Sequence, residues 1–453
     1  MKKFMIGGFA SALLVLAACG GGATSSTPAG GSSTPAGGSS TPAGGSSTPA
    51  ASSAVEVKVW VANEIVALTK TQLGEAKKAL EAELGDGTTI NYTVNPVGEG
   101  DAAGNMITDV ESGADIFGFA QDQLARLYTA GALTEVSGAA AETIQTANDS
   151  GALRAATFGG KVVAYPMTSD NGYFLYYDTS VFSADDVKDW GTLLAKAEQA
   201  QKYVYFNGTS AWYNFGFFYG AGADSVWTTN AAGKFTAHED TYATKGLAGA
   251  KGLLKLVTNP QYVDRSVASG FVGKATEGEG EEAHEIEVPT ACAVVSGTWD
   301  YNTAKAALGD KLGATALPSF TVDGKTYHTG SFSGNKLIGV KPQKDAKKTA
   351  ICQRTAQYLT GEVCQLQRFE EVAWGPSNKV AAANQKVTAN PALAALAAQN
   401  EYAKPQGQFP GGWWNTAGAI GASLKDLGAN ATDAQIQAVL DTYADGLDTL
   451  LDK

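Results

Sequence analysis

The most constraining feature of this sequence is an alternation of strand and helix patterns that begins at Val55. Val55 to Val61 alternates apolar and polar residues, which is typical of a half-buried strand. Leu68 to Leu84 places its leucines on one helical face and stops at Gly85. The pattern then continues through a strand at Thr89–Val94, a helix at Ala102–Glu111 and a short buried strand at Asp115–Phe119. This order predicts an open α/β sheet with parallel strands, which binds ligands at the strands' carboxyl ends.

A second unit of the same kind follows Lys161 to Pro166. Its predicted elements are a helix at Asp189–Ala200, a strand at Tyr203–Phe206 and the start of an aromatic helix at Tyr213–Tyr219. From Lys347 onward the sequence is predicted to be mostly helical. About 400 residues are too many for one hydrophobic core, so we expect two domains.

The first 54 residues do not share this pattern. A cationic start, Met1-Lys2-Lys3, precedes an apolar segment from Phe4 to Ala18 that is too short to span a bilayer. The segment ends in Leu16-Ala17-Ala18-Cys19, which resembles the lipobox of bacterial lipoproteins. That resemblance implies a lipoprotein signal peptide over residues 1–18, with Cys19 lipidated and anchored in the membrane. The alternative is an ordinary signal peptide in which Cys19 is incidental.

Residues 19–54 are predicted to be a disordered tether. A seven-residue repeat places prolines at Pro28, Pro35, Pro42 and Pro49, and the segment after Cys19 has no charge and no large apolar side chain. Such a segment cannot bury enough surface to offset the entropy of ordering. Coil statistics give a root-mean-square span of roughly 30–35 Å, and the stretched chain reaches about 115 Å. A glycosylated stalk is the competing interpretation of this composition.

Charge and cysteine content exclude several classes of function. Without Lys2 and Lys3 the chain has 31 basic and 45 acidic residues, a net charge of −14, so we expect no nucleic-acid partner. Besides Cys19 there are three cysteines, Cys292, Cys352 and Cys364, and an odd number does not indicate a disulfide framework, although a Cys352–Cys364 bond stays open. We expect Cys292 to be buried in the apolar run Ala291–Val295. Since no C-x-x-C motif occurs, neither a zinc knuckle nor a thioredoxin-type site is indicated.

Catalytic signatures are scarce. The chain has three histidines, His238, His284 and His328, and no G-x-S-x-G, H-E-x-x-H or phosphate-binding loop motif. The glutamate-rich run Glu277–Glu287 could bind a cation, but a solvated loop is the better interpretation because charge runs repel and extend. We therefore predict no catalytic residue, no metal and no cofactor.

Eight tryptophans are the most distinctive side chains. We expect Trp190 in a core and Trp60 in a core or at a pocket rim. Trp212, Trp299 and the pair Trp413-Trp414 lie beside small or polar residues at element boundaries, where a ring can project into a cleft. Flat rings pack against the C–H faces of sugars, but they also fill interfaces. Composition and spacing alone favour the core for each of them.

Several stretches together resemble the extracellular solute-binding proteins of carbohydrate importers, above all the maltose- and maltodextrin-binding proteins. The resemblance runs from about Val55 to the end of the chain. Its pieces are Val57–Trp60, Ala114–Phe117, Tyr128–Leu133, Phe158–Pro166, Leu175–Asp178, Ser296–Trp299 and Gly313–Pro318.

This resemblance implies a type II periplasmic-binding-protein-like α/β fold, with two discontinuous lobes, a hinge and an interlobe cleft that closes around a sugar. The solute-binding domain would span 55–453, and the chain would cross between lobes near Thr168 and again near Phe320. Lobe 1 would comprise about 55–168 and 321–376, and lobe 2 about 169–320 and 377–453.

The resemblance also implies site residues. The stacking aromatics fall on Phe119, Trp212, Trp299, and Trp413 or Trp414. The carboxylates that accept hydrogen bonds from sugar hydroxyls fall on Glu64, Asp122 and Asp170. The sequence departs from the family pattern at Phe119, where a Trp is expected, and at Ile65, Gln123 and Ser210, where charged residues are expected. Stacking is retained while polar contacts are fewer, which favours a glucan-type ligand of altered length or linkage.

The expected function is that of a non-catalytic, lipid-anchored receptor that acts as a monomer. It would bind a maltodextrin-type α-glucan and deliver it to the permease of an ABC transporter on the extracellular face of the membrane. The long tether favours a Gram-positive surface. The alternatives are a binding protein for a different sugar, an adhesin, or a secreted carbohydrate-active enzyme, which needs two carboxylates about 5–10 Å apart.

Overall fold

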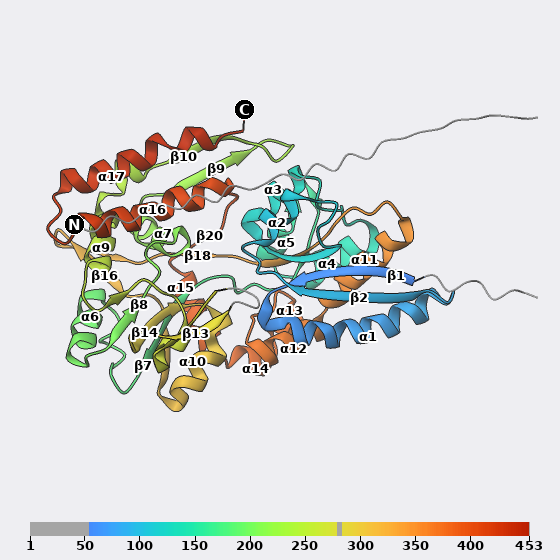
Figure 1. Ribbon diagram of the computed structural model, residues 1–453, viewed down its shortest axis with the longest axis horizontal. Helices are drawn as coiled ribbons and strands as arrows, with labels where there is room; N and C mark the ends of the chain where they lie inside the picture. Colours follow the sequence, from blue (N-terminus) through green and yellow to red (C-terminus); the bar gives the residue numbers. More distant parts are fainter. Residues whose placement is uncertain (1–53, 279–282, 453) are drawn as a thin grey trace, which may run out of the picture. The chain divides into compact units, whose positions relative to one another are not determined.

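The computed structural model describes residues 54–278 and 283–452 (Figure 1). The predictions for the signal peptide, for Cys19 and for nearly all of the tether fall outside these residues. In the described part of the chain, no helix is long and apolar enough to cross a membrane.

The first five-stranded sheet has the order β2-β1-β3-β19-β6. β1 pairs in parallel with β2 and β3, while β19 runs antiparallel to β3 and β6. Val57, Val59 and Val61 alternate into the core, so the strand pattern predicted from Val55 is confirmed. The strands are β1 (Ala54–Val61), β2 (Thr89–Pro96), β3 (Ile116–Ala120), β6 (Tyr165–Pro166) and β19 (Lys336–Val340).

Helices cover this first sheet. α1 (Val66–Leu84) joins β1 to β2 and ends at Gly85, whose φ of 62° is the left-handed conformation that favours glycine. α11 (Ala346–Leu359) and α12 (Glu362–Val372) pack beside α1. We call the elements packed around this sheet the first lobe.

The second five-stranded sheet has the order β11-β8-β14-β7-β15. Every residue of β7 and β14 is buried because helices and loops cover both faces of the sheet, which divides the surrounding core into two clusters. The strands are β7 (Phe174–Asp178), β8 (Tyr203–Tyr205), β11 (Tyr262–Val263), β14 (Ala291–Ser296) and β15 (Leu312–Thr315). We call the elements around this sheet the second lobe.

The C-terminal helices belong to the second lobe, where Figure 1 shows them side by side. α16 (Gly411–Leu427) packs against α7 (Ala211–Gly220), α9 (Leu247–Val257) and α17 (Asp433–Asp445). Gly418 permits this close packing, because a Cβ atom there would lie 2.6 Å from the Thr209 carbonyl oxygen. α6 (Trp190–Gln199) begins where predicted, with the Asp189 side chain accepting a hydrogen bond from the Thr192 amide.

Three crossing segments connect the lobes. The first is 167–172, between β6 and β7, and the third is 373–378, which follows α12. The second was predicted near Phe320, but Phe320 and Phe332 are buried in the core of the second lobe. β16 (Ser319–Val322) pairs with β17 (Lys325–His328), and β18 (Ser331–Ser333) pairs with β20 (Ala403–Pro405). The chain therefore crosses later, at Gly334–Asn335, because these strands must finish before β19 enters the first sheet.

Two smaller differences from the predictions concern α2 and the acidic run. α2 (Ala102–Thr108) ends before the predicted Glu111. Part of the acidic run, predicted to be a solvated loop, instead forms the antiparallel pair β12 (Lys274–Glu277) and β13 (His284–Glu287), with 279–282 outside the described residues.

Trp190 and Cys292 are buried as predicted. Cys292, Cys352 and Cys364 are free thiols.

Candidate functional site

A cavity of about 1410 Å³ lies between the lobes. Its first-lobe wall is built at the carboxyl ends of three parallel strands, as expected for an open α/β sheet. Asn63 and Glu64 follow β1, Glu99 and Asp101 follow β2, and Asp122 follows β3. Polar residues that follow each of these strands therefore line the cavity.

The second-lobe wall is aromatic. Trp212 is at the start of α7, Trp299 follows β14, and Trp414 is in the first turn of α16. The ring centres of Trp212 and Trp414 are 6.3 Å apart. Buried Phe332 stacks behind Trp212 at 5.3 Å, which holds that ring at the surface of the cavity.

Lys336 and Glu99 form an ion pair in the cavity wall. Lys336 is the first residue of β19, opposite Ala120 of β3, and its Nζ atom lies 3.9 Å from Glu99 Oε2. Burial raises the pKa of Glu99, while the ammonium of Lys336 lowers that pKa. The pair is nearly buried, with 6 % and 12 % of the two side chains exposed.

Asp122 has a perturbed acidity. Burial raises the pKa of its carboxyl group to about 7, because the loss of hydration outweighs the stabilising effects of Arg126, Gln406 and the Trp414 indole. The group is therefore poised to be a hydrogen-bond donor below neutral pH and an acceptor above it. Gln406 and Trp414 come from the second lobe, so Asp122 lies where the two walls meet.

The structure brings five of the eight predicted site residues to this cavity. They are Glu64, Asp122, Trp212, Trp299 and Trp414. Their assignment to a ligand stays a prediction.

Phe119 and Trp413 do not line the cavity. Phe119 is fully buried in the first lobe, with its ring centre 5.7 Å from that of Phe117. Trp413 is fully buried in the second lobe, where it stacks on Phe409 and donates a hydrogen bond from Nε1 to the Tyr443 hydroxyl at 3.0 Å. Successive residues of a helix point about 100° apart, so only one of the Trp413-Trp414 pair can face the cavity.

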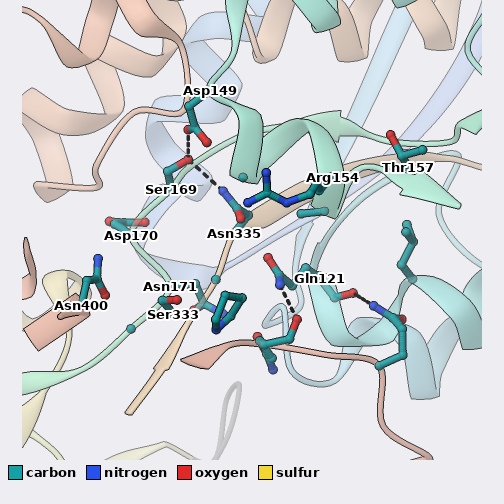
Figure 2. Close-up of a pocket in the computed structure, with 18 of the residues that line it drawn as sticks. Gln121, Asp149, Arg154, Thr157, Ser169, Asp170, Asn171, Ser333, Asn335 and Asn400 are labelled. Carbon is teal, nitrogen blue, oxygen red and sulfur yellow. Dashed lines mark hydrogen bonds between the residues drawn. The ribbon is translucent and has the colours of Figure 1, made fainter. Parts of the chain in front are cut away.

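Asp170 also lies outside the lining of the large cavity. It lines a second cavity, of about 420 Å³, formed by both lobes and the first two crossing segments (Figure 2). Figure 2 shows a chain of hydrogen bonds there: Asn335 Nδ2 donates to Ser169 Oγ, which donates to Asp149 Oδ2. The carboxylate of Asp170 accepts hydrogen bonds from Thr298 Oγ1 and the Gly375 amide. Asn171 and Gln406 line both cavities.

Sequence reasoning missed several residues of the large cavity. Glu99 could have been found, because it follows a predicted strand of the first sheet. No comparable signal marks Lys336, since its place depends on the antiparallel pairing of β19 with β3. The others are polar residues on loops and helix starts: Asn63, Asp101, Asn105, Arg126, Gln406 and Asn415.

The cavity offers hydrogen bonding and stacking. No histidine is among its lining residues. Within residues 54–278 and 283–452, no group of three histidine, cysteine or acidic side chains could hold a metal ion. A polar wall opposite an aromatic wall suits a ligand that has hydroxyl edges and apolar faces.

Two α/β lobes around such a cleft define a solute-binding protein. A family model described as bacterial extracellular solute-binding protein matches residues 75–395, and the chain belongs to this family. A search of curated proteins found no match.

Solved structures have the same fold. One determined with acarbose is 27 % identical, covers 87 % of this chain and 99 % of its own, and has a TM-score of 0.71. The maltodextrin binding protein MalE1 from L. casei BL23, without ligand, is 23 % identical. The match covers 87 % of this chain and 99 % of the MalE1 chain, with a TM-score of 0.69. A cyclo/maltodextrin-binding protein complexed with maltotetraose is 20 % identical. That match covers 88 % of this chain and 98 % of the other, with a TM-score of 0.63. The last two show likeness of fold.

Proposed function

We propose that this protein captures a maltodextrin-type α-glucan oligosaccharide between its lobes and delivers it to the permease of an ABC transporter. The observation that carries the proposal is the division of the cavity. Three indole rings of the second lobe face carboxylates of the first lobe. A sugar ring would stack its C–H face on the indoles while its hydroxyl groups donate to Glu64 and Asp122.

The size of the cavity favours an oligosaccharide. Its volume of about 1410 Å³ exceeds the roughly 300–1,000 Å³ that is usual for small-molecule sites. Trp212 and Trp414 are near neighbours, while Trp299 comes from a different loop, so separate sugar units can use separate rings. The likeness to the structure determined with acarbose supports the same ligand class.

The cellular setting is part of the proposal. Cleavage after Ala18 and lipidation of Cys19 would hold the protein on the extracellular face of the membrane, in a Gram-positive cell. The tether would let the binding domain reach the permease. In this setting the protein acts as a monomer, without a cofactor and without catalysis.

Calorimetry with linear, branched and cyclic glucans tests the proposal. We expect saturable heat with linear maltodextrins and weaker binding of maltose. If only a different class of sugar gives heat, that class would be the ligand in place of maltodextrin. No heat with any soluble sugar would favour an adhesin. Release of reducing ends from maltodextrin would identify an enzyme instead.

Trp299 gives the sharpest single substitution. We expect Trp299→Ala to weaken maltodextrin binding by about 2 kcal/mol or more, because anchor aromatics dominate contact energies. Thermal unfolding must be measured in parallel, since Trp299 is half-buried and its removal also lowers stability. Unchanged affinity in a folded variant would remove Trp299 from the site.

A further inference from the structure

Asp170 is at the point where the three crossing segments meet. It lies in the first crossing, its side chain is 1 % exposed, and Oδ2 accepts a hydrogen bond from the Gly375 amide of the third crossing at 2.6 Å. Ser169, the preceding residue, donates its amide to the Gly375 carbonyl oxygen at 2.9 Å. A Cβ atom on Gly375 would lie 2.9 Å from Asp170 Cβ, so this close approach requires glycine.

The second crossing is bonded to the same segment. Asn335 Nδ2 donates to the Thr168 carbonyl oxygen at 3.0 Å, and Asn171 donates its amide to the Gly334 carbonyl oxygen at 3.0 Å. Figure 2 labels Asp170, Asn171 and Asn335 near one another at this cavity. Rotation of one lobe against the other must therefore act on residues 168–171.

The same carboxylate oxygen holds the loop that carries Trp299. Thr298 Oγ1 donates to Asp170 Oδ2 at 2.5 Å, and Thr298 is fully buried. Gly297 is held by a hydrogen bond from the Tyr176 hydroxyl to its carbonyl oxygen, at 3.0 Å. The Trp299 ring covers Gly297, where a Cβ atom would lie 2.1 Å from the ring. The backbone before Thr298 is therefore held by Tyr176, and the Thr298 hydroxyl links this loop to the crossings.

We propose that Asp170 is a positioning residue, which sets the orientation of Trp299 through Thr298 and couples that ring to the angle between the lobes. The inference rests on the proposed function, because Trp299 is its sugar-contacting group. This positioning role takes the place of the direct contact with sugar that was expected for Asp170 from the sequence. A charge-assisted hydrogen bond suits this role, since it is short and directional.

Thr298→Val and Thr298→Ser form the test pair. Valine keeps the shape of the side chain and removes the donor, which leaves a buried carboxylate with one partner fewer, whereas serine keeps the hydroxyl. Thr298→Val should weaken maltodextrin binding about tenfold or more, and Thr298→Ser should stay near the wild type. Thr355→Val is the matched control: Thr355 is also fully buried, and its hydroxyl pairs with Tyr92 in the first lobe, away from the cavity.

A double-mutant cycle separates positioning from general destabilisation. In a Trp299→Ala background, Thr298→Val should have little further effect on affinity, because the ring that it orients is gone. Equal fold-losses in both backgrounds would overturn the inference.

Hydrogen exchange of the sugar-free protein tests the link without a ligand. Thr298→Val should speed exchange in residues 296–300 and 168–171, and Thr298→Ser should not. Unchanged exchange in both segments would overturn the inference. If the wild type binds no glucan, the proposed function is refuted. The hydrogen-exchange comparison of the two Thr298 variants can still be interpreted, because it uses no ligand.

Discussion

The Nζ atom of Lys336, a residue that lines the interlobe cavity, lies 3.4 Å from the centre of the Trp374 ring in the first-lobe core. Both side chains are nearly buried, and the same ammonium is 5.6 Å from the centre of the Trp299 ring. A cation over an indole face is attracted by the ring quadrupole, most strongly where water is excluded. This contact joins the first-lobe core to the cavity, and its charge is balanced by Glu99.

Lys336→Met should destabilise the fold in a pH-dependent way. Removing one partner of a buried ion pair costs about 3–5 kcal/mol, because the other charge stays buried and unpaired. Loss of the ammonium further raises the pKa of Glu99, so protonation should relieve part of this cost at low pH. Urea unfolding should therefore show a larger loss at pH 8 than at pH 5. Adding Glu99→Gln to Lys336→Met should remove this difference between pH 8 and pH 5. A double variant whose stability loss keeps the pH dependence of Lys336→Met alone would contradict the pairing of Lys336 with Glu99.

Asp122 should make stability fall as pH rises through the weakly acidic range. Its pKa is about 7 in the folded protein, against roughly 3.9 for an unfolded aspartate. Between these values the folded state binds the proton more tightly than the unfolded state, so the contribution is favourable below about pH 4 and is lost by about pH 7. Asp122→Asn should flatten the corresponding part of the curve of unfolding free energy against pH. Parallel curves for the two proteins would show that Asp122 does not titrate there.

Neighbouring tryptophans should give opposite phenotypes. Trp413→Ala should lower the free energy of unfolding by about 3–5 kcal/mol, because it empties a buried site and removes the hydrogen bond to Tyr443. Trp414→Ala should weaken maltodextrin affinity about tenfold or more, with a smaller loss of stability, because its half-buried ring lines the cavity. Urea unfolding and calorimetry on both variants check this. The reverse pattern would reassign the two rings.

The tip of the hairpin between β9 (Ser225–Thr229) and β10 (Phe235–Asp240) should depend on Gly233. Thr129 Oγ1, in α3 (Leu124–Thr129) of the first lobe, donates to the Ala232 carbonyl oxygen at 2.7 Å. A Cβ atom on Gly233 would lie 2.1 Å from Thr129 Oγ1 and 2.8 Å from the Ala125 carbonyl oxygen. Gly233→Ala should therefore break a contact between the lobes and speed hydrogen exchange in α3.

Gly222→Ala is the matched control for the hairpin. Gly222 also has a positive φ, 93° against 82° for Gly233, but a Cβ atom there meets nothing within 4 Å. Both variants carry the strain of alanine in this conformation, so their difference reports the interlobe contact. Equal melting temperatures and equal exchange in the two variants would show that the contact contributes nothing.

Cys19→Ser tests the proposed anchor. Without the thiol there is no acceptor for the lipid, so the protein should move from the membrane fraction to the medium. Glucan affinity should not change. A variant that stays with the membrane would show that Cys19 is not the point of attachment.

Local patterns were enough to predict much of the architecture. The alternation at Val55–Val61, the helix stop at Gly85 and the helix predicted from Asp189 are all in the structure, because each depends on residues close together in the chain. The predicted strands also locate one wall of the cavity, since polar residues beyond parallel strands collect at one edge of a sheet. Glu64 and Asp122 are in that wall.

Long-range packing settles the rest. Whether Trp413 or Trp414 faces the cavity depends on how α16 rotates against α7, and Phe119 is buried because the first-lobe core covers its side of β3. The place of the second crossing depends on the pairing of β18 with β20, whose residues are about seventy positions apart. Asp170 points to Thr298 and Gly375, not to the large cavity, because three distant segments converge on it. A sequence pattern records which residues tend to be buried or polar, but the partners of a buried polar group come from distant parts of the chain, and they are known once the chain has folded.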